Sequence, residues 1–144
     1  MSITKSTIGD DFIRTYNIRA KKPKSGYTAA VGDLTVPDFT LADGVDRGAS
    51  NENPTGIVIS INSSNGTLSI AELTGGVTIV LEYTSTAPTL GQKIECNGDR
   101  GTVLPSRDRV RVDDTNGVGA VIAVGVVLDP SVSLAPSTCC VRFP

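Results

Sequence analysis

Residues 55–83 read TGIVISINSSNGTLSIAELTGGVTIVLEY, three short apolar segments separated by Asn65-Gly66 and Gly75-Gly76. Both dipeptides favour tight turns between strands, because their residues tolerate a positive φ angle. We therefore predict strands over residues 56–61, 67–73 and 77–83. In the last of these, strict alternation places Val77, Ile79 and Leu81 on the side that faces the core.

The same strand-and-turn composition continues on both sides of this stretch. Asn97 to Gly101 is expected to form a tight turn, and residues 42–55 a polar loop. Turn signals recur about every 8–12 residues, and no segment has convincing helical periodicity. Further strand candidates lie at residues 27–31, 34–36, 39–41, 91–96, 102–104, 107–112, 119–128 and 138–143. The sequence thus predicts a single all-β domain over residues 27–144, either a compact sandwich or a small barrel.

Residues 1–26 differ in composition and are predicted to be an extended, basic N-terminal arm. The segment KKPKSG at 21–26 is a run of charges broken by proline and closed by glycine. Residues 1–30 carry a net charge of +4, and the remainder of the chain carries −6. Such an arm is either simply solvated or lies on an acidic partner surface. In the second case the contact residues would be Phe12, Arg14, Tyr16, Arg19, Lys21, Lys22 and Lys24.

Composition limits the partners that we expect. The 144 residues suffice for one domain, whose core must consist of Val, Ile and Leu because aromatic residues make up only 4%. The chain lacks both an apolar run of membrane-spanning length and an apolar leader near its N-terminus, so we expect neither a membrane partner nor classical export. A net charge of −2 gives no reason to expect free nucleic acid as a partner.

Few residues suggest catalysis. The absence of histidine excludes Ser-His-Asp and Cys-His arrangements and histidine metal ligands. Asp113-Asp114 precedes Thr-Asn-Gly, a composition typical of turns. Cys96, Cys139 and Cys140 contain no C-x-x-C spacing and are interpreted as reduced, apolar filling residues. We therefore expect no enzyme, no cofactor and no metal site.

Three arginines alternate along one predicted strand. Arg107, Arg109 and Arg111 would share one face, with about 7 Å between successive members. This stripe is either paired across the sheet with Glu72, Glu82 or Glu95, or forms salt bridges to a neighbouring subunit.

A series of glycine–valine phrases links the chain to a known family. They are GDLTV (32–36), PTGIVIS (54–60), GGVTIVL (75–81), LGQKIECNGDRGTV (90–103), VIAVGVVLD (121–129) and CCVRF (139–143). With these phrases, the chain from Gly32 onward resembles the small capsid decoration (cement) proteins of tailed bacteriophages.

The resemblance implies a compact β-tulip or barrel-like body without enzymatic activity. It further implies a homotrimer on the outer capsid surface of the virion, which would stabilise contacts between subunits of the major capsid protein. Members of that family often grip the shell with an extended N-terminus. The alternative is a receptor- or glycan-binding module of a phage fibre or adhesin, which the all-β fold and the 42–55 loop would suit. The shortage of aromatic residues counts against a sugar site.

Overall fold

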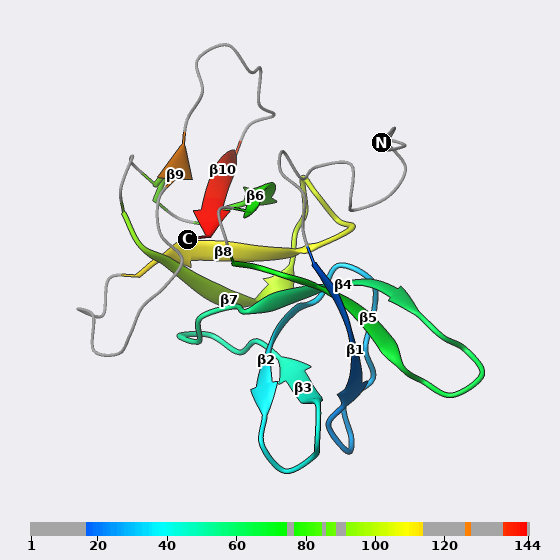
Figure 1. Ribbon diagram of the computed structural model, residues 1–144. Coiled ribbons are helices and arrows are strands. Elements are labelled where there is room, and N and C mark those ends of the chain that lie inside the picture. Colours follow the sequence, from blue (N-terminus) through cyan, green and yellow to red (C-terminus); the bar gives the residue numbers. More distant parts are fainter. Residues whose placement is uncertain are drawn as a thin grey trace.

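The computed structural model describes residues 17–74, 77–84, 86–88, 92–113, 126–127 and 137–143. Within these ranges the chain forms strands and connecting turns, and no helix (Figure 1). The prediction of an all-β fold is therefore confirmed. The strands are β1 (Ile18–Pro23), β2 (Leu34–Asp38), β3 (Gly44–Arg47), β4 (Gly56–Ile61), β5 (Leu68–Glu72), β6 (Val77–Glu82), β7 (Ile94–Arg100), β8 (Asp108–Val112), β9 (Val126–Val127) and β10 (Thr138–Phe143).

The first five strands close into a barrel in the order β1-β3-β2-β4-β5. The closing strand, β1, is antiparallel to β5 and parallel to β3. β4 and β5 form a hairpin whose connection is closed by the amide of Asn62, which donates to the carbonyl of Thr67 at 2.8 Å. Gly66 has a φ of +74°, so the glycine that the sequence placed in this turn occupies a conformation that other residues adopt with strain.

The remaining strands form two small sheets beside the barrel. One has the order β6-β10-β9, and the other pairs β7 with β8. An isolated parallel bridge between Tyr83 and Val110 connects the two. Figure 1 shows these sheets together on one side of the barrel, away from the β2–β3 hairpin.

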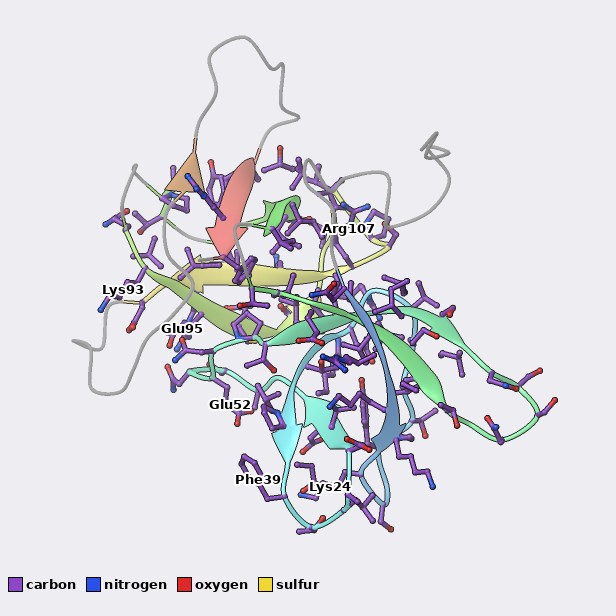
Figure 2. The ribbon with its side chains drawn as sticks, viewed as in Figure 1. Lys24, Phe39, Glu52, Lys93, Glu95 and Arg107 are labelled. Atoms are coloured by element: carbon purple, nitrogen blue, oxygen red, sulfur yellow. The ribbon has the colours of Figure 1, made fainter. Side chains whose placement is uncertain are left out.

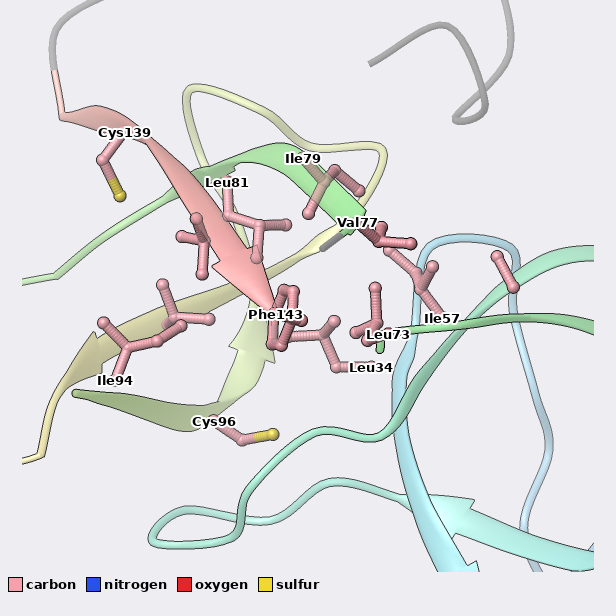
Figure 3. Close-up of a cluster of buried hydrophobic side chains, with 13 residues drawn as sticks. Leu34, Ile57, Leu73, Val77, Ile79, Leu81, Ile94, Cys96, Cys139 and Phe143 are labelled. Carbon is pink, nitrogen blue, oxygen red and sulfur yellow. The ribbon is translucent and has the colours of Figure 1, made fainter. Parts of the chain in front are cut away.

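Alternation along the barrel strands divides the apolar side chains between two clusters. The smaller cluster fills part of the barrel interior and consists of Val45, Val58, Leu68 and Ile70. The larger cluster lies between the outer face of the barrel and the two small sheets (Figure 3). It includes Leu34 and Ile57 from the barrel and Val77, Ile79, Leu81, Ile94, Cys139 and Phe143 from the sheets. The predicted inward face of Val77, Ile79 and Leu81 is confirmed, since each is 2% exposed or less.

The predicted arm is wrong for residues 18–23, which form β1. Ile18 to Lys21 pair with Ala71 to Leu68 of β5, so this segment closes the barrel instead of extending from it. A basic strand suits this place because its residues are all exposed or half-buried. Pro23 is the last residue of β1. Proline has no backbone N–H to donate, and at the end of the strand this breaks no further hydrogen bond between strands. Phe12, Arg14 and Tyr16 lie outside the described residues.

Other local predictions also need correction. Residues 27–31, 39–41 and 102–104 are turns, bends and irregular chain, not strands. The predicted 42–55 loop contains β3, which pairs with both β1 and β2. The predicted turn at Asn97 to Gly101 lies largely within β7, whose pairing with β8 shifts register between Cys96 and Arg100. Here a bulge accommodates the turn-forming residues without ending the strand.

The cysteine interpretation is supported at two positions. Cys96 is a free cysteine, and both Cys96 and Cys139 are buried in the larger apolar cluster. Burial, followed by the nearby carboxylates of Asp108, Glu52 and Glu95, raises the pKa of the Cys96 thiol well above its ordinary value of 9.0. The Cys140 side chain and most of the predicted 119–128 strand lie outside the described residues.

Candidate functional site

A buried cluster of ion pairs joins the barrel to the β7–β8 sheet. Asp33 and Asp108 are each 2% exposed; Asp33 directly precedes β2, and Asp108 is the first residue of β8. Arg47 of β3 donates two hydrogen bonds to Asp108, from Nη2 to Oδ1 at 2.7 Å and from Nε to Oδ2 at 3.1 Å. Arg100 of β7 donates from Nη2 to Asp33 Oδ1 at 2.5 Å. Each carboxylate thus binds an arginine from a different strand, which fixes the two parts of the fold to each other.

Tyr27 completes the same cluster. Its hydroxyl donates to Asp33 Oδ2 at 2.6 Å. Burial, followed by the hydrogen bond to the Asp33 carboxylate, raises the pKa of Tyr27 far above its ordinary value of 10.0. The phenol therefore remains a protonated donor at neutral pH, and the cluster carries a structural role that the sequence did not indicate.

The three arginines of the predicted stripe are engaged within the chain. Arg107 is only 7% exposed and donates from Nη1 to the Val80 carbonyl at 3.1 Å. Arg109 binds both oxygens of Asp99, from Nε at 2.9 Å and from Nη2 at 2.7 Å. This pairing lowers the pKa of the Asp99 carboxyl, against the smaller opposing effect of its burial.

Pairing across the sheet is confirmed for Glu95, whereas Glu82 contacts the stripe from β6 of the neighbouring sheet. Arg111 donates from Nε to Glu95 Oε1 at 2.8 Å, and Arg109 reaches Glu82 Oε2 at 3.4 Å. Glu72 is wrong as a partner, because it lies in the barrel and pairs with Arg19 instead. A contact of the stripe with another subunit stays a prediction, although its guanidinium groups already have partners here.

Glu82 holds the loop that follows β7. Its Oε1 accepts the amides of Thr102, Val103 and Leu104 at 2.7, 2.6 and 3.0 Å. Burial alone would raise the pKa of Glu82, but these amides together outweigh burial and hold the pKa below its ordinary value of 4.5. A charged carboxylate is thus retained in a side chain that is 2% exposed.

The exposed candidate for binding a partner is the tip of the β2–β3 hairpin. Phe39 is 93% exposed there, and Leu41 is 41% exposed. The turn itself is well ordered: Asp38 accepts the Thr40 hydroxyl at 2.7 Å, and the Gly44 amide donates to the Leu41 carbonyl at 3.2 Å. An aromatic ring is therefore presented to solvent on a fixed turn.

Two basic residues, Lys22 of β1 and Lys24 just after it, lie at the same end of the barrel. The amide of Lys22 donates to the Asp43 carbonyl at 2.9 Å, and that of Lys24 donates to the Val45 carbonyl at 2.8 Å. Figure 2 shows Lys24 and Phe39 together at this end. We call Lys22, Lys24, Phe39 and Leu41 the hairpin end. The sequence suggested the lysines, whereas Phe39 and Leu41 were assigned to a strand.

Of the other predicted contact residues, Arg19 and Lys21 lie on the face of β1 that borders the barrel interior, where the Arg19 side chain is still 65% exposed and that of Lys21 29%. A cavity inside the barrel has both among its lining residues. The alternation along β1 therefore divides its basic residues, with Lys22 and Lys24 left on the outer, exposed side.

Comparisons with known proteins do not assign the chain. No protein-family model matches it, and no curated protein matches it. Among the residues that the structure describes, no cluster of three or more histidine, cysteine, aspartate or glutamate side chains could hold a metal ion. The described part of the chain also contains no helix long and apolar enough to cross a membrane.

Proposed function

We propose that this protein is a structural virion protein, a capsid decoration protein of a tailed bacteriophage. It would bind the outer surface of the shell through the hairpin end and stabilise contacts between major capsid subunits. The observation that carries this proposal is Phe39, a 93% exposed aromatic ring on a hydrogen-bonded turn. The resemblance of the strand phrases from Gly32 onward supplies the class of partner.

The chemistry of the hairpin end supports binding to a protein surface. Aromatic side chains are frequent anchors of interfaces, where they fill a pocket at the centre of the contact. Hydrogen bonds already hold the backbone of the turn that carries Phe39, which limits the entropic cost of association to ordering of the exposed side chain. Lys22 and Lys24 lie at the same end as Asp38, Asp43 and Asp46, and Lys24 Nζ is 3.8 Å from Asp46 Oδ2, so the ring is surrounded by charges of both signs and favours an acceptor pocket with a mixed polar rim.

Assembly as a homotrimer would strengthen such a contact. A single hairpin end offers one aromatic anchor and therefore a small interface. Three copies linked in one assembly bind with an avidity well above that of each end alone, provided that all three reach their sites together. Residues 1–16, which include Phe12, Arg14 and Tyr16, are proposed to extend the contact as the arm.

Light scattering and co-sedimentation test the proposal. The full chain is expected to be trimeric or to become so on the shell, and to sediment with expanded shells of its own major capsid protein. A variant that lacks residues 2–16 keeps β1 and should bind with reduced occupancy, whereas a cut at residue 26 would remove a barrel strand. No sedimentation of the full chain with expanded shells would refute the proposal.

The same aromatic ring favours one second candidate, a glycan-binding module. Sugar rings stack on exposed aromatic side chains, and Phe39 offers such a face. A glycan array separates the two functions. Saturable binding of a glycan that is lost in Phe39→Ala, without binding to shells, would support this candidate.

A further inference from the structure

The interior of the barrel is only partly filled by apolar side chains. Thr35, Gly56 and Glu72 are neighbours in a row across β2, β4 and β5, since Thr35 pairs with Gly56 and Gly56 with Glu72. Directly paired residues point to the same face of a sheet, so these three positions face inward together. The glycine in the middle supplies no side chain, which leaves space between the threonine and the glutamate.

That space is a cavity of about 370 Å³ to which all five barrel strands contribute. Its walls include the aliphatic side chains of Val45 and Ile70. A Cβ atom at Gly56 would lie 2.4 Å from Ile70 Cγ2 and 3.0 Å from Thr35 Oγ1, so glycine keeps this part of the interior open. The volume is within the range of small-molecule pockets, about 300–1,000 Å³.

A buried hydroxyl lines the cavity without a hydrogen-bond partner. Thr35 is 1% exposed, and its Oγ1 has no hydrogen-bond partner in the described part of the chain. An unsatisfied buried polar group of this kind costs about 1–3 kcal/mol. A valine at this position would have the same shape and would avoid the cost of the unsatisfied hydroxyl. The presence of threonine therefore indicates that a polar partner enters the cavity and hydrogen-bonds to it.

The charged groups around the cavity favour an anion. Arg19 and Lys21 are positive and Glu72 is negative, which leaves a net charge of +1 on the lining. Arg19 Nε is held by Glu72 Oε1 at 2.5 Å. Lys21 Nζ is 3.7 Å from Asp43 Oδ1, and the Asp43 side chain is 76% exposed. The Lys21 ammonium therefore has only a weak, solvated partner and can bind a carboxylate.

We propose that the barrel interior is a binding site for a small hydroxy- or oxo-carboxylate. The hydroxyl or carbonyl group of the ligand hydrogen-bonds to Thr35 Oγ1. Its short carbon chain packs against Val45 and Ile70, and its carboxylate binds Lys21. This inference rests on the cavity alone and is independent of the proposed function on the capsid.

The test uses 3-hydroxybutyrate as the probe and the full chain labelled at threonine, valine and isoleucine methyl groups for NMR. Saturable shifts are expected for the methyl signals of Thr35, Val45 and Ile70. Butyrate, which lacks the hydroxyl, should bind about 10-fold more weakly because one hydrogen bond is lost. Butylamine, a cation of similar length, should cause no saturable shift.

Matched variants assign the contacts. Thr35→Val should weaken binding of 3-hydroxybutyrate about 10-fold while the folded state becomes no less stable, since the substitution removes an unsatisfied hydroxyl. Lys21→Gln should weaken binding, whereas Lys22→Gln, on the outer side of the same strand, should not. If Thr35→Val failed to fold, two measurements would still test the proposal: the comparison of butyrate with 3-hydroxybutyrate, and the comparison of Lys21→Gln with Lys22→Gln.

Three results would overturn the proposal. The first is the absence of saturable shifts at these methyl groups with 3-hydroxybutyrate. The second is equal binding of butyrate and 3-hydroxybutyrate together with unchanged binding by Thr35→Val, which would leave the hydroxyl without a ligand. The third is an equal loss with Lys21→Gln and Lys22→Gln, which would indicate a general charge effect.

Discussion

Arg47 and Asp108 are 61 residues apart in the sequence and form a two-point ion pair between β3 and the start of β8. Asp108 Oδ2 also accepts the amide of Leu34 at 3.1 Å. One buried carboxylate therefore connects three segments of the fold. The guanidinium of Arg47 is partly exposed, but the carboxylate that it neutralises is not.

Removal of the Asp108 charge is predicted to destabilise the protein. Asp108→Asn removes the nearer of the two carboxylates beside Arg47, leaving Asp33 at 3.8 Å, and the loss of hydrogen bonds to a charged group costs about 2 kcal/mol. Urea unfolding at neutral pH measures the change. Asp43→Asn is the matched control, because its pair with Lys21 is long and exposed and should contribute less than about 1 kcal/mol. Equal effects of the two substitutions would contradict a stabilising role of the cluster.

Gly32 should be far less tolerant of alanine than Gly26. Both have a positive φ, +95° and +89°, so alanine is strained at either position by about 1–2 kcal/mol. At Gly32 a Cβ atom would also lie 1.9 Å from the Ser106 carbonyl oxygen, while at Gly26 nothing lies within 4 Å. We expect Gly32→Ala to separate the barrel from the chain around Ser106 and to lower the unfolding free energy well beyond the loss in Gly26→Ala. Similar losses in thermal unfolding would argue against this packing.

Acid should destabilise the protein in part through Glu82. Because the pKa of Glu82 is lower in the folded state than its ordinary value of 4.5, its contribution to stability is complete above that value. The contribution is lost as the pH falls through the lower, folded value. Glu82→Gln should be less stable than the parent by about 2 kcal/mol at neutral pH, since it loses hydrogen bonds to a charged group.

Urea unfolding from neutral pH down to about pH 3 tests the sign of this effect. The difference between the parent protein and Glu82→Gln should narrow as the pH falls. A difference that stayed constant would show that the carboxylate charge contributes nothing to holding the amides of residues 102–104.

The parts of the fold that were predictable from sequence are those where composition and pairing agree. β10 was predicted over exactly the residues that form it, because Thr138 to Phe143 are rich in apolar and β-branched residues and both neighbours are turn formers. β4 and β6 followed in the same way. The hairpin between β4 and β5 was indicated by Asn65-Gly66, whose local backbone preference needs no distant contact.

Segments whose structure depends on distant partners were not predictable. β1 is a charged segment that becomes a strand because β5 and β3 supply its hydrogen-bond partners. β3 contains one apolar residue, Val45, and was taken for a loop. Phe39 and Leu41 have the composition of a strand, but the side chain of Asp38 binds Thr40 and turns the chain there. Local propensity is overridden by such contacts.

The contacts of the candidate sites were likewise predictable only where a local sequence pattern sets the direction of the side chain. Alternation along β8 correctly predicted that Arg111 points toward Glu95 across the sheet, whereas the contact of Arg109 with Glu82 joins two sheets. The ion pair between Arg19 and Glu72 joins residues 53 positions apart, and no local sequence pattern predicts it. The barrel cavity depends on the register of Thr35, Gly56 and Glu72, which only the closed barrel defines.

The most direct test of the central proposal is the occupancy of Phe39→Ala on expanded shells of the protein's own major capsid protein. Ile61→Ala, which shortens another exposed apolar side chain at the β4–β5 hairpin, is the control. Phe39→Ala should keep the parent's thermal stability because its side chain is 93% exposed, whereas Ile61→Ala, at 38% exposure, loses some packing and is used at a temperature where thermal unfolding shows it folded. The proposal predicts that Phe39→Ala lowers affinity for the shell by about 10-fold or more, as expected for an aromatic anchor, while Ile61→Ala binds like the parent. Full occupancy by Phe39→Ala at the parent's concentration would contradict it.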